Sequence, residues 1–324
     1  MEHKEIAALA QAIKANMAQL LIGKDHELQL VLVGLFAGGH VLLDDVPGTG
    51  KTVLAKSLAR SVDCQFARIQ FTADLLPSDI TGLNVYNQKA GEFVFQPGPA
   101  FTNILLADEI NRATPRTQSA LLECMEEKQI TVDGVTKPLE RPFFVIATQN
   151  PVETAGTFAL PEAQLDRFLL RLSLGYPRHE ESATVLTNYL AGRGSNEMVL
   201  EPVATGMQIA EAQAAVGQIR VDPVVVDYIV RLAEATRHHD DVALGVSTRG
   251  MLSMLRCCQA LAAIEGRAYV LPDDVKQLAG PVFAHRLILN SRYGSSQKSA
   301  ELIEQLLSSV PAPTEDPNAK LPTA

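Results

Sequence analysis

The segment from His40 to Lys56, HVLLDDVPGTGKTVLAK, constrains this chain more than any other. Its apolar run, 41–43, predicts a short buried strand, and Pro47–Gly50 makes a tight glycine-rich turn. Apolar side chains recur at helical spacing from residue 51 onward. A strand, a glycine turn and a helix N-terminus direct backbone N–H groups and the positive end of the helix dipole at a phosphate chain. The segment therefore predicts a nucleotide-binding loop; the alternative is an ordinary glycine turn.

Within this loop, Lys51 is placed to reach the β- and γ-phosphates of ATP, and the Thr52 hydroxyl is placed to ligate Mg²⁺. Asp45 stands where the usual P-loop pattern has its first glycine, so its carboxylate must turn away from the phosphates. The residues expected to contact the nucleotide are Pro47, Gly48, Thr49, Gly50, Lys51, Thr52 and Val53.

A second acidic segment, NILLADE, runs from Asn103 to Glu109 and predicts a buried strand that ends in two carboxylates. Asp108 is expected to hold Mg²⁺ through water, and Glu109 is expected to orient and deprotonate the attacking water. A strand that merely ends in solvated acids is the alternative. The position of the pair downstream of a P-loop favours the catalytic interpretation.

Three further residues are candidates for a phosphoryl-transfer site. Asn150 follows the apolar run 143–147 and is expected beside the γ-phosphate, although a turn-forming Asn before proline is the alternative. Arg167 precedes the last strand, and an arginine there can stabilise transition-state charge from a neighbouring subunit. Arg249 opens a helix with Ser247 as its cap, from where it is expected to reach back to the nucleotide. Solvated or salt-bridged arginines are the alternative for both.

The order of patterns along the chain predicts an α/β fold in two parts. Strands expected at 41–43, 65–71, 103–107, 143–147 and 169–174 alternate with helices such as 115–127, which indicates a parallel sheet covered on both faces. Short hairpins are expected within 81–99 and 130–137. The predicted organisation is a core over 1–175, an all-helical lid over 176–310, and a proline-rich disordered tail over 311–324.

Composition excludes several classes of protein. The net charge of −9 over 324 residues argues against broad nucleic-acid binding. No stretch approaches the twenty apolar residues that a membrane span needs, and the N-terminus does not read as a signal peptide. The four cysteines lack CxxC spacing, which indicates reduced thiols in a cytoplasmic protein. The run 238–241, HHDD, is interpreted as a polar turn at a helix end and not as a metal site.

At this point the chain resembles the MoxR branch of the AAA+ ATPases. The matching pieces, in order, are DDVPGTGKT, ILLADEINRA, FFVIATQNP, LPEAQLDRF and GVSTRG. The resemblance covers about residues 6–307 and implies an αβα ATPase core followed by a helical lid. It implies a Walker B role for Asp108 and Glu109, sensor 1 for Asn150, sensor 2 for Arg249, and the finger in trans for Arg167, with Arg171 as the alternative. It also implies that Ile22 and Gly23 contact adenine, and that the two hairpins are the insert in helix 2 and the hairpin before sensor 1.

The resemblance further implies a Mg²⁺-dependent ATPase that assembles as a ring homo-oligomer, expected to be a hexamer. Such a ring would act as a chaperone or maturation factor on a client protein, with a partner bearing a von Willebrand factor A domain. Hydrolysis is expected to swing the lid against the core and to pass that motion to the client through the hairpins. Two other functions are retained: a nucleotide-gated binding scaffold with little turnover, and a DNA-translocating motor, against which the charge weighs.

Overall fold

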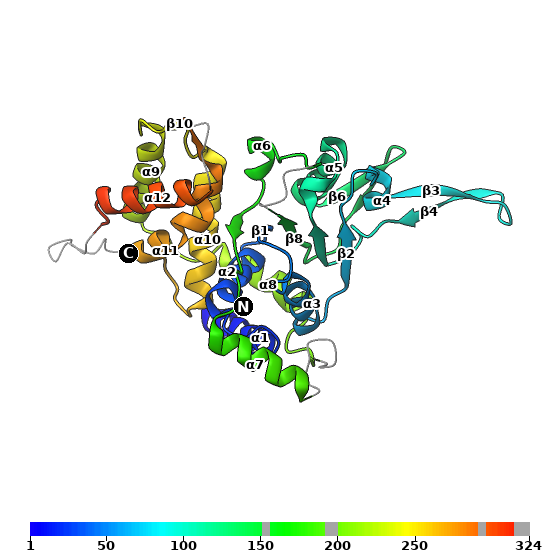
Figure 1. Cartoon of the computed structure of the whole chain (residues 1–324), viewed down its shortest axis with the longest axis horizontal. Helices are drawn as coiled ribbons and strands as arrows, with labels where there is room; N and C mark the ends of the chain where they lie inside the picture. Colours follow the sequence, from blue (N-terminus) through cyan, green and yellow to red (C-terminus); the bar gives the residue numbers. More distant parts are fainter. Residues whose placement is uncertain (151–155, 192–199, 291–295, 314–324) are drawn as a thin grey trace.

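A computed structural model describes residues 1–150, 156–191, 200–290 and 296–313. Its centre is a five-stranded parallel sheet (Figure 1). The strand order is β2-β5-β8-β1-β9. All five expected strands are present, with ends that differ by up to two residues. They are β1 Val41–Asp44, β2 Phe66–Gln70, β5 Ile104–Asp108, β8 Phe144–Gln149 and β9 Leu170–Leu172.

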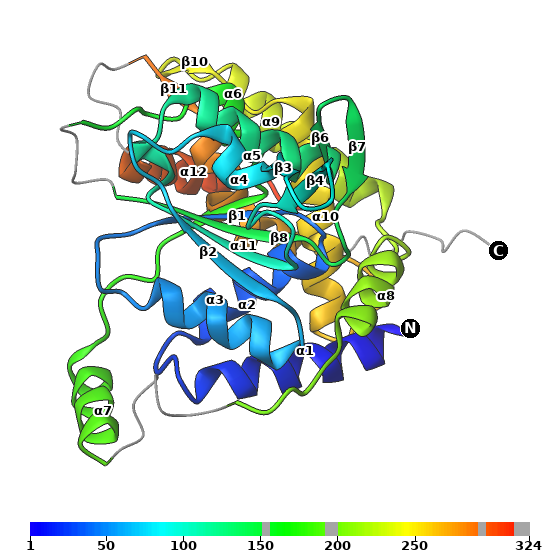
Figure 2. The ribbon, with the colours of Figure 1, turned by 90° about the vertical axis from the view of Figure 1, so that its right-hand side faces the viewer.

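Helices cover both faces of this sheet, as the alternating pattern predicted (Figure 2). Successive strand side chains point to opposite faces, so Val41 and Leu43 lie in one apolar core while Leu42 lies in the other. The first core includes side chains of α1 His3–Ala18, α2 Asp25–Phe36 and α3 Lys51–Ser61. The second includes side chains of α4 Pro77–Thr81 and α5 Pro115–Glu127.

Both expected hairpins form. The first is β3 Gly82–Asn87 with β4 Glu92–Pro97, which extends away from the body of the molecule (Figure 1). The second is β6 Gln129–Val132 with β7 Val135–Pro138, and its turn has the positive φ angles that an Asp-Gly turn adopts. Asn84 Nδ2 of the first hairpin donates to Asp133 Oδ2 of the second at 2.7 Å. The two hairpins are therefore in direct contact.

The second half of the chain is helical but not exclusively so. Its helices are α7 His179–Leu190, α8 Gly206–Val216, α9 Pro223–Arg237, α10 Thr248–Ile264, α11 Pro272–Phe283 and α12 Ser296–Ser309. An antiparallel pair, β10 Val242–Leu244 with β11 Ile288–Leu289, also lies there, and the sequence pattern did not indicate it because both strands are very short. α7 stands apart from α9–α12 (Figure 2). It lies instead beside the turn between α1 and α2, where Glu181 sits directly over Gly23.

One continuous apolar core joins the two halves. α10 packs against both α1 and α2, and its Cys257 and Cys258 are fully buried in the core that also contains the first-half side chains Ile13 and Phe36. These thiols are free and serve packing. Separating α10 from the first half would expose this core, so the expected swing of the helical region within one chain meets a large hydrophobic penalty.

Three short segments complete the described chain: η1 Ile110–Arg112, α6 Glu162–Leu165 and η2 Ala284–Arg286. Within the described ranges, every helix is too short or too polar to span a bilayer. The predicted disordered tail lies outside the described residues except for 311–313, where Pro311 O accepts a hydrogen bond from Arg231 Nη1 at 3.1 Å.

Candidate functional site

The loop between β1 and α3 has the shape that its sequence predicted. Gly48 and Gly50 adopt φ angles of 86° and 91°, in the left-handed region that glycine tolerates best. A Cβ on Gly48 would meet no atom within 4 Å, so the space in front of the loop is open. Lys51 Nζ folds back over the loop and donates to the carbonyl of Asp45 at 3.0 Å. The loop therefore forms an open cradle of backbone groups, with the Lys51 ammonium group at its edge.

Asp45 turns its carboxylate away from this cradle, as expected. It is 3% exposed and accepts hydrogen bonds from Ser173 Oγ at 2.7 Å and from the backbone N–H groups of Leu174 and Gly175 at 2.6 and 3.0 Å. Buried charge is tolerated when it is saturated by donors in this way. Asp45 therefore ties the P-loop to the segment that follows β9.

The two acids after β5 face the loop across a cavity of about 430 Å³, lined by Lys51, Thr52, Asp108 and Glu109 among others. The sheet brings them together because β5 is separated from β1 only by β8, and parallel strands end at one edge. Asp108 Oδ1 accepts from Thr148 Oγ1 and Oδ2 from Arg68 Nη2, each at 2.6 Å. A cation held by Asp108 through water would compete with Arg68 for this carboxylate.

Glu109 is restrained in this structure. Its φ of 56° is unusual for a residue with a side chain, and its backbone N–H donates to Thr148 Oγ1 at 2.9 Å. Its carboxylate accepts from Gln70 Nε2 at 2.7 Å and pairs with Arg112 Nε at 3.0 Å. A general base needs a free lone pair within reach of its water. The carboxylate of Glu109 lies beside the cavity, where its contacts with Gln70 and Arg112 restrain it.

Asn150 follows β8 directly and is half-buried. Since β8 lies between β5 and β1, its carboxyl end lies between the two acids that end β5 and the P-loop that follows β1. That Asn150 lies beside the γ-phosphate stays a prediction.

A second cavity, of about 240 Å³, lies on the other side of the P-loop. Ile22 and the loop residues Gly48, Thr49, Gly50 and Val53 line it, and α7 closes it with Val185, Asn188 and Tyr189. The neighbouring Gly23 has a φ of 72°. An apolar slot with a few polar groups suits a nucleobase. The contribution of α7 was not predicted, because 179–190 falls within the expected lid and no local pattern indicates contact with a loop so distant in the sequence.

The two candidate arginines lie at the opposite edge of the sheet. Arg167 precedes β9, and it lines a cavity of about 290 Å³ with Gly38 and Gly39, which precede β1. Arg249 lines the same cavity. The P-loop follows β1, and this four-residue strand spans about 13 Å at 3.3 Å per residue. The expectation that Arg249 reaches back to the nucleotide of its own chain is therefore wrong, because the sheet lies between them.

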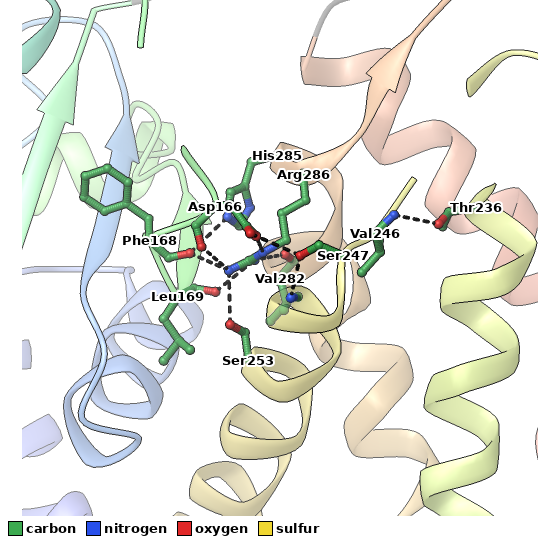
Figure 3. A network of polar contacts seen from close by, with 11 residues as sticks. Asp166, Phe168, Leu169, Thr236, Val246, Ser247, Ser253, Val282, His285 and Arg286 are labelled. Atoms are coloured by element: carbon green, nitrogen blue, oxygen red, sulfur yellow. Dashed lines mark hydrogen bonds and ion pairs between the residues drawn. The ribbon is translucent and has the colours of Figure 1, made fainter. Parts of the chain in front are cut away.

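A buried polar network fixes the backbone that carries both arginines (Figure 3). Arg286, whose side chain is 2% exposed, pairs with Asp166 Oδ1 at 2.7 Å and donates to the carbonyl of Phe168 at 2.6 Å. Asp166 Oδ2 accepts from Ser247 Oγ at 3.1 Å, and the same Oγ caps α10 by accepting from the N–H of Gly250. Burial lowers the pKa of Arg286, and the Asp166 charge opposes that shift. The segment 166–169 and the start of α10 are thus held together.

Arg171, the alternative finger, is engaged elsewhere. It lies inside β9 and pairs with Asp44 of the neighbouring strand. Its side chain is 18% exposed, against 32% for Arg167. An arginine that must contact another subunit needs an accessible head group, and Arg167 is the more exposed of the two. Its role in trans stays a prediction.

Sequence reasoning missed several residues that contact the candidate site, namely Arg68, Gln70, Arg112 and Thr148 near the acids and Asp166 and Arg286 near the arginines. Arg68 and Gln70 sit at alternate positions of β2, which is the signal for a shared face. That signal acquires meaning only once β2 is known to pair with β5, where Gln70 opposes Asp108.

The residues at the P-loop fit a nucleoside triphosphate with magnesium. An open glycine loop, an ammonium group, the Thr52 hydroxyl and the Asp108 carboxylate converge on one cavity. Hydroxyl and carboxylate oxygens are the ligands that Mg²⁺ prefers, usually together with water and phosphate oxygens.

Comparison with known proteins identifies the family. Residues 40–170 match the model of the ATPase family associated with various cellular activities, and residues 234–306 match the AAA lid domain. The YeaC protein of Bacillus subtilis strain 168 is 46% identical over 95% of both chains. Chaperone MoxR1 of Mycobacterium tuberculosis is 39% identical over 95% of this chain and 83% of its own. A crystal structure of a Cytophaga hutchinsonii protein superposes with a TM-score of 0.87 at 36% identity, covering 96% and 97% of the two chains. With its P-loop core, its lid and these relatives, the chain belongs to the MoxR family of AAA+ ATPases.

Proposed function

We propose that this protein hydrolyses ATP at a site shared between two copies of the chain. The observation that carries the proposal is the separation of the catalytic parts: the P-loop and Glu109 lie at one edge of the sheet, and Arg167 and Arg249 lie at the other. Head-to-tail contact between copies would bring the arginines of one to the P-loop of the next. A heterologous contact of this kind closes into a ring when its rotation permits, and we propose a hexamer.

In the proposed reaction, the P-loop N–H groups and Lys51 hold the triphosphate, and Asn150 orients the attacking water. Glu109 accepts a proton from that water as its oxygen bonds to the γ-phosphorus and the bond to the ADP oxygen breaks. Magnesium bound through Thr52 and Asp108 would neutralise charge on the phosphate oxygens. Arg167 and Arg249 of the adjoining copy stabilise the charge that develops on the transferring group.

The proposed output is movement between subunits, because the shared core and the Arg286 network bind the helical half to the sheet within each chain. The β3–β4 hairpin is the proposed contact for a client protein: it projects from the body (Figure 1), and its Phe93 and Tyr86 are 71% and 52% exposed. Because a relative at 39% identity is named a chaperone, we infer a chaperone or maturation role, with a von Willebrand factor A domain protein as partner.

The test of the hydrolytic role is Glu109→Gln. This variant should bind ATP as tightly as the wild type while releasing no phosphate above background, because it keeps the cradle and loses the base. Binding is measured with a fluorescent ATP analogue and turnover by phosphate release. Turnover near the wild-type rate would remove Glu109 from the mechanism.

A nucleotide-gated scaffold with little turnover is the second candidate, and one observation favours it. Gln70 and Arg112 both hold the Glu109 carboxylate in the present conformation. Phosphate release by the wild type alone, at protein concentrations where it assembles, separates the two functions. A scaffold would exchange ATP without consuming it.

A further inference from the structure

Glu126, in the last turn of α5, binds both candidate arginines at once. Its Oε1 accepts from Arg249 Nη2 at 2.5 Å, and its Oε2 pairs with Arg167 Nε at 3.1 Å. The three residues come from separate parts of the chain: α5, the segment before β9, and the first turn of α10. One carboxylate therefore occupies the head groups that the proposed function assigns to a neighbouring triphosphate.

The surroundings of Glu126 are rich in positive charge. Lys128 and Arg256 line the same cavity as Arg167 and Arg249, and the carboxylates that line it are Glu126 and Asp166. Asp166 is committed to Arg286 and Ser247, as described above. Burial, followed by the charges of Arg256 and Arg141, lowers the pKa of Lys128. Glu126 is thus the carboxylate left to balance this cavity, and a second anion there would be attracted as soon as Glu126 withdraws.

Glu126 is not needed to position the backbone of the arginine site; its carboxylate occupies that site. The Arg286 network fixes the backbone next to Arg167 and Arg249 without any contribution from Glu126. What Glu126 determines is the direction of two guanidinium groups. A carboxylate presents two oxygens in a plane, as does one side of a phosphoryl group, and guanidinium binds both in the same manner.

We propose that Glu126 is an intramolecular stand-in for the γ-phosphate, which keeps Arg167 and Arg249 occupied until the triphosphate on a second copy displaces it. The inference rests on the proposed shared site. The side chains of Glu126, Arg167 and Arg249 are 37%, 32% and 47% exposed, so solvent screens the two ion pairs. A triphosphate carries several charges where Glu126 carries one, so it wins the competition while still having to displace the carboxylate.

The consequence is a weaker ATP-dependent contact between copies than the arginines alone would make. Two exposed ion pairs that must be broken should raise the protein concentration needed for assembly by about fivefold. In the absence of nucleotide they have no competitor, so Glu126 should not affect the oligomeric state there. This dependence on nucleotide distinguishes a stand-in from a residue that only supports the fold.

The experiment measures assembly by sedimentation in a Glu109→Gln background, where bound ATP is retained. Adding Glu126→Gln, which is isosteric and uncharged, should lower the half-assembly concentration about fivefold with ATP and leave it unchanged without nucleotide. Glu127→Gln in the same background is the matched control, because Glu127 is exposed on the same turn and its loss changes the net charge equally. Its curve should coincide with that of Glu109→Gln alone.

The outcomes separate the inference from the proposed function. If Glu109→Gln assembles with ATP but Glu126→Gln fails to tighten it, or if Glu127→Gln tightens it equally, the stand-in role is overturned and the shared site survives. Weaker assembly would also overturn it, since Glu126 would then be orienting the arginines productively. If Glu109→Gln fails to assemble at any concentration, with or without ATP, the shared site falls and the inference falls with it. Assembly that ATP does not strengthen overturns the inference alone.

Discussion

Mixing two inactive variants tests the shared site most directly. Lys51→Ala removes the cation of the P-loop, and Arg167→Ala removes an arginine of the opposite edge, so each protein alone should have little turnover. In a mixed ring, an Arg167→Ala subunit still has an intact P-loop. It becomes active where its neighbour is a Lys51→Ala subunit, which still offers Arg167.

The size of the recovery follows from the geometry of the ring. Suppose that each site takes its P-loop from one copy and its arginine from the next. In an equal mixture, about one quarter of the contacts between neighbouring subunits are then competent. The mixture should therefore show about a quarter of the wild-type turnover per subunit. If arginine and P-loop acted within one chain, the recovery would be zero.

A second mixture makes the result independent of calibration. Wild type mixed equally with the double variant Lys51→Ala/Arg167→Ala should also reach about a quarter of the wild-type rate when catalysis is shared, but about half when it is not. Phosphate release is measured after the subunits have been exchanged and reassembled with ATP. Equal rates in the two mixtures support the shared site. No recovery in the first with half recovery in the second would refute the reasoning from the sheet.

Three further predictions follow from individual contacts. Asp166→Asn leaves the buried Arg286 without its counter-charge and should lower the free energy of unfolding by about 3 kcal/mol, measured by urea titration; a loss below about 1 kcal/mol would show that the backbone carbonyls suffice. Gln70→Leu frees Glu109 from one of two restraints and should raise basal phosphate release about fivefold, while a fall would mean that Gln70 positions the base. Burial lowers the pKa of His40 to about 4, and its two ring nitrogens already bond to backbone groups. As the pH falls below the unfolded value of 6.5, the unfolded chain binds the proton first, so His40 should cost about 2 kcal/mol of stability between pH 7 and pH 5. The variant His40→Gln should lack that share of the pH dependence in urea titrations at both pH values.

Local sequence patterns were sufficient to predict the strands of the parallel sheet, the two hairpins and the P-loop. The P-loop is a contiguous segment whose conformation depends on its own glycines, and hairpins such as 130–137 depend on their own turn residues. The direction of the Asp45 carboxylate also followed from the sequence, because a charge inside a phosphate cradle would repel the ligand. Each of these conclusions needs only neighbouring residues.

The same patterns failed where a role depends on distant partners. Arg249 was expected at the nucleotide of its own chain. That expectation failed because the start of a helix gives no information about which edge of the sheet the helix meets. The pairing of Arg167 and Arg249 through Glu126 joins three segments that no spacing relates. The α7 helix was assigned to the lid by its position in the chain, yet it lies over the turn at Ile22.

The sequence by itself determined the chemistry of this protein: a phosphate-binding turn, two acids after a buried strand, and arginines suited to phosphoryl groups. Only the tertiary structure decided which of these groups share a site. The physical reason is that parallel strands collect their carboxyl ends at one edge and their amino ends at the other, and a residue's edge depends on the strand order β2-β5-β8-β1-β9 and on the packing of α10. Those are long-range contacts, which no local pattern encodes.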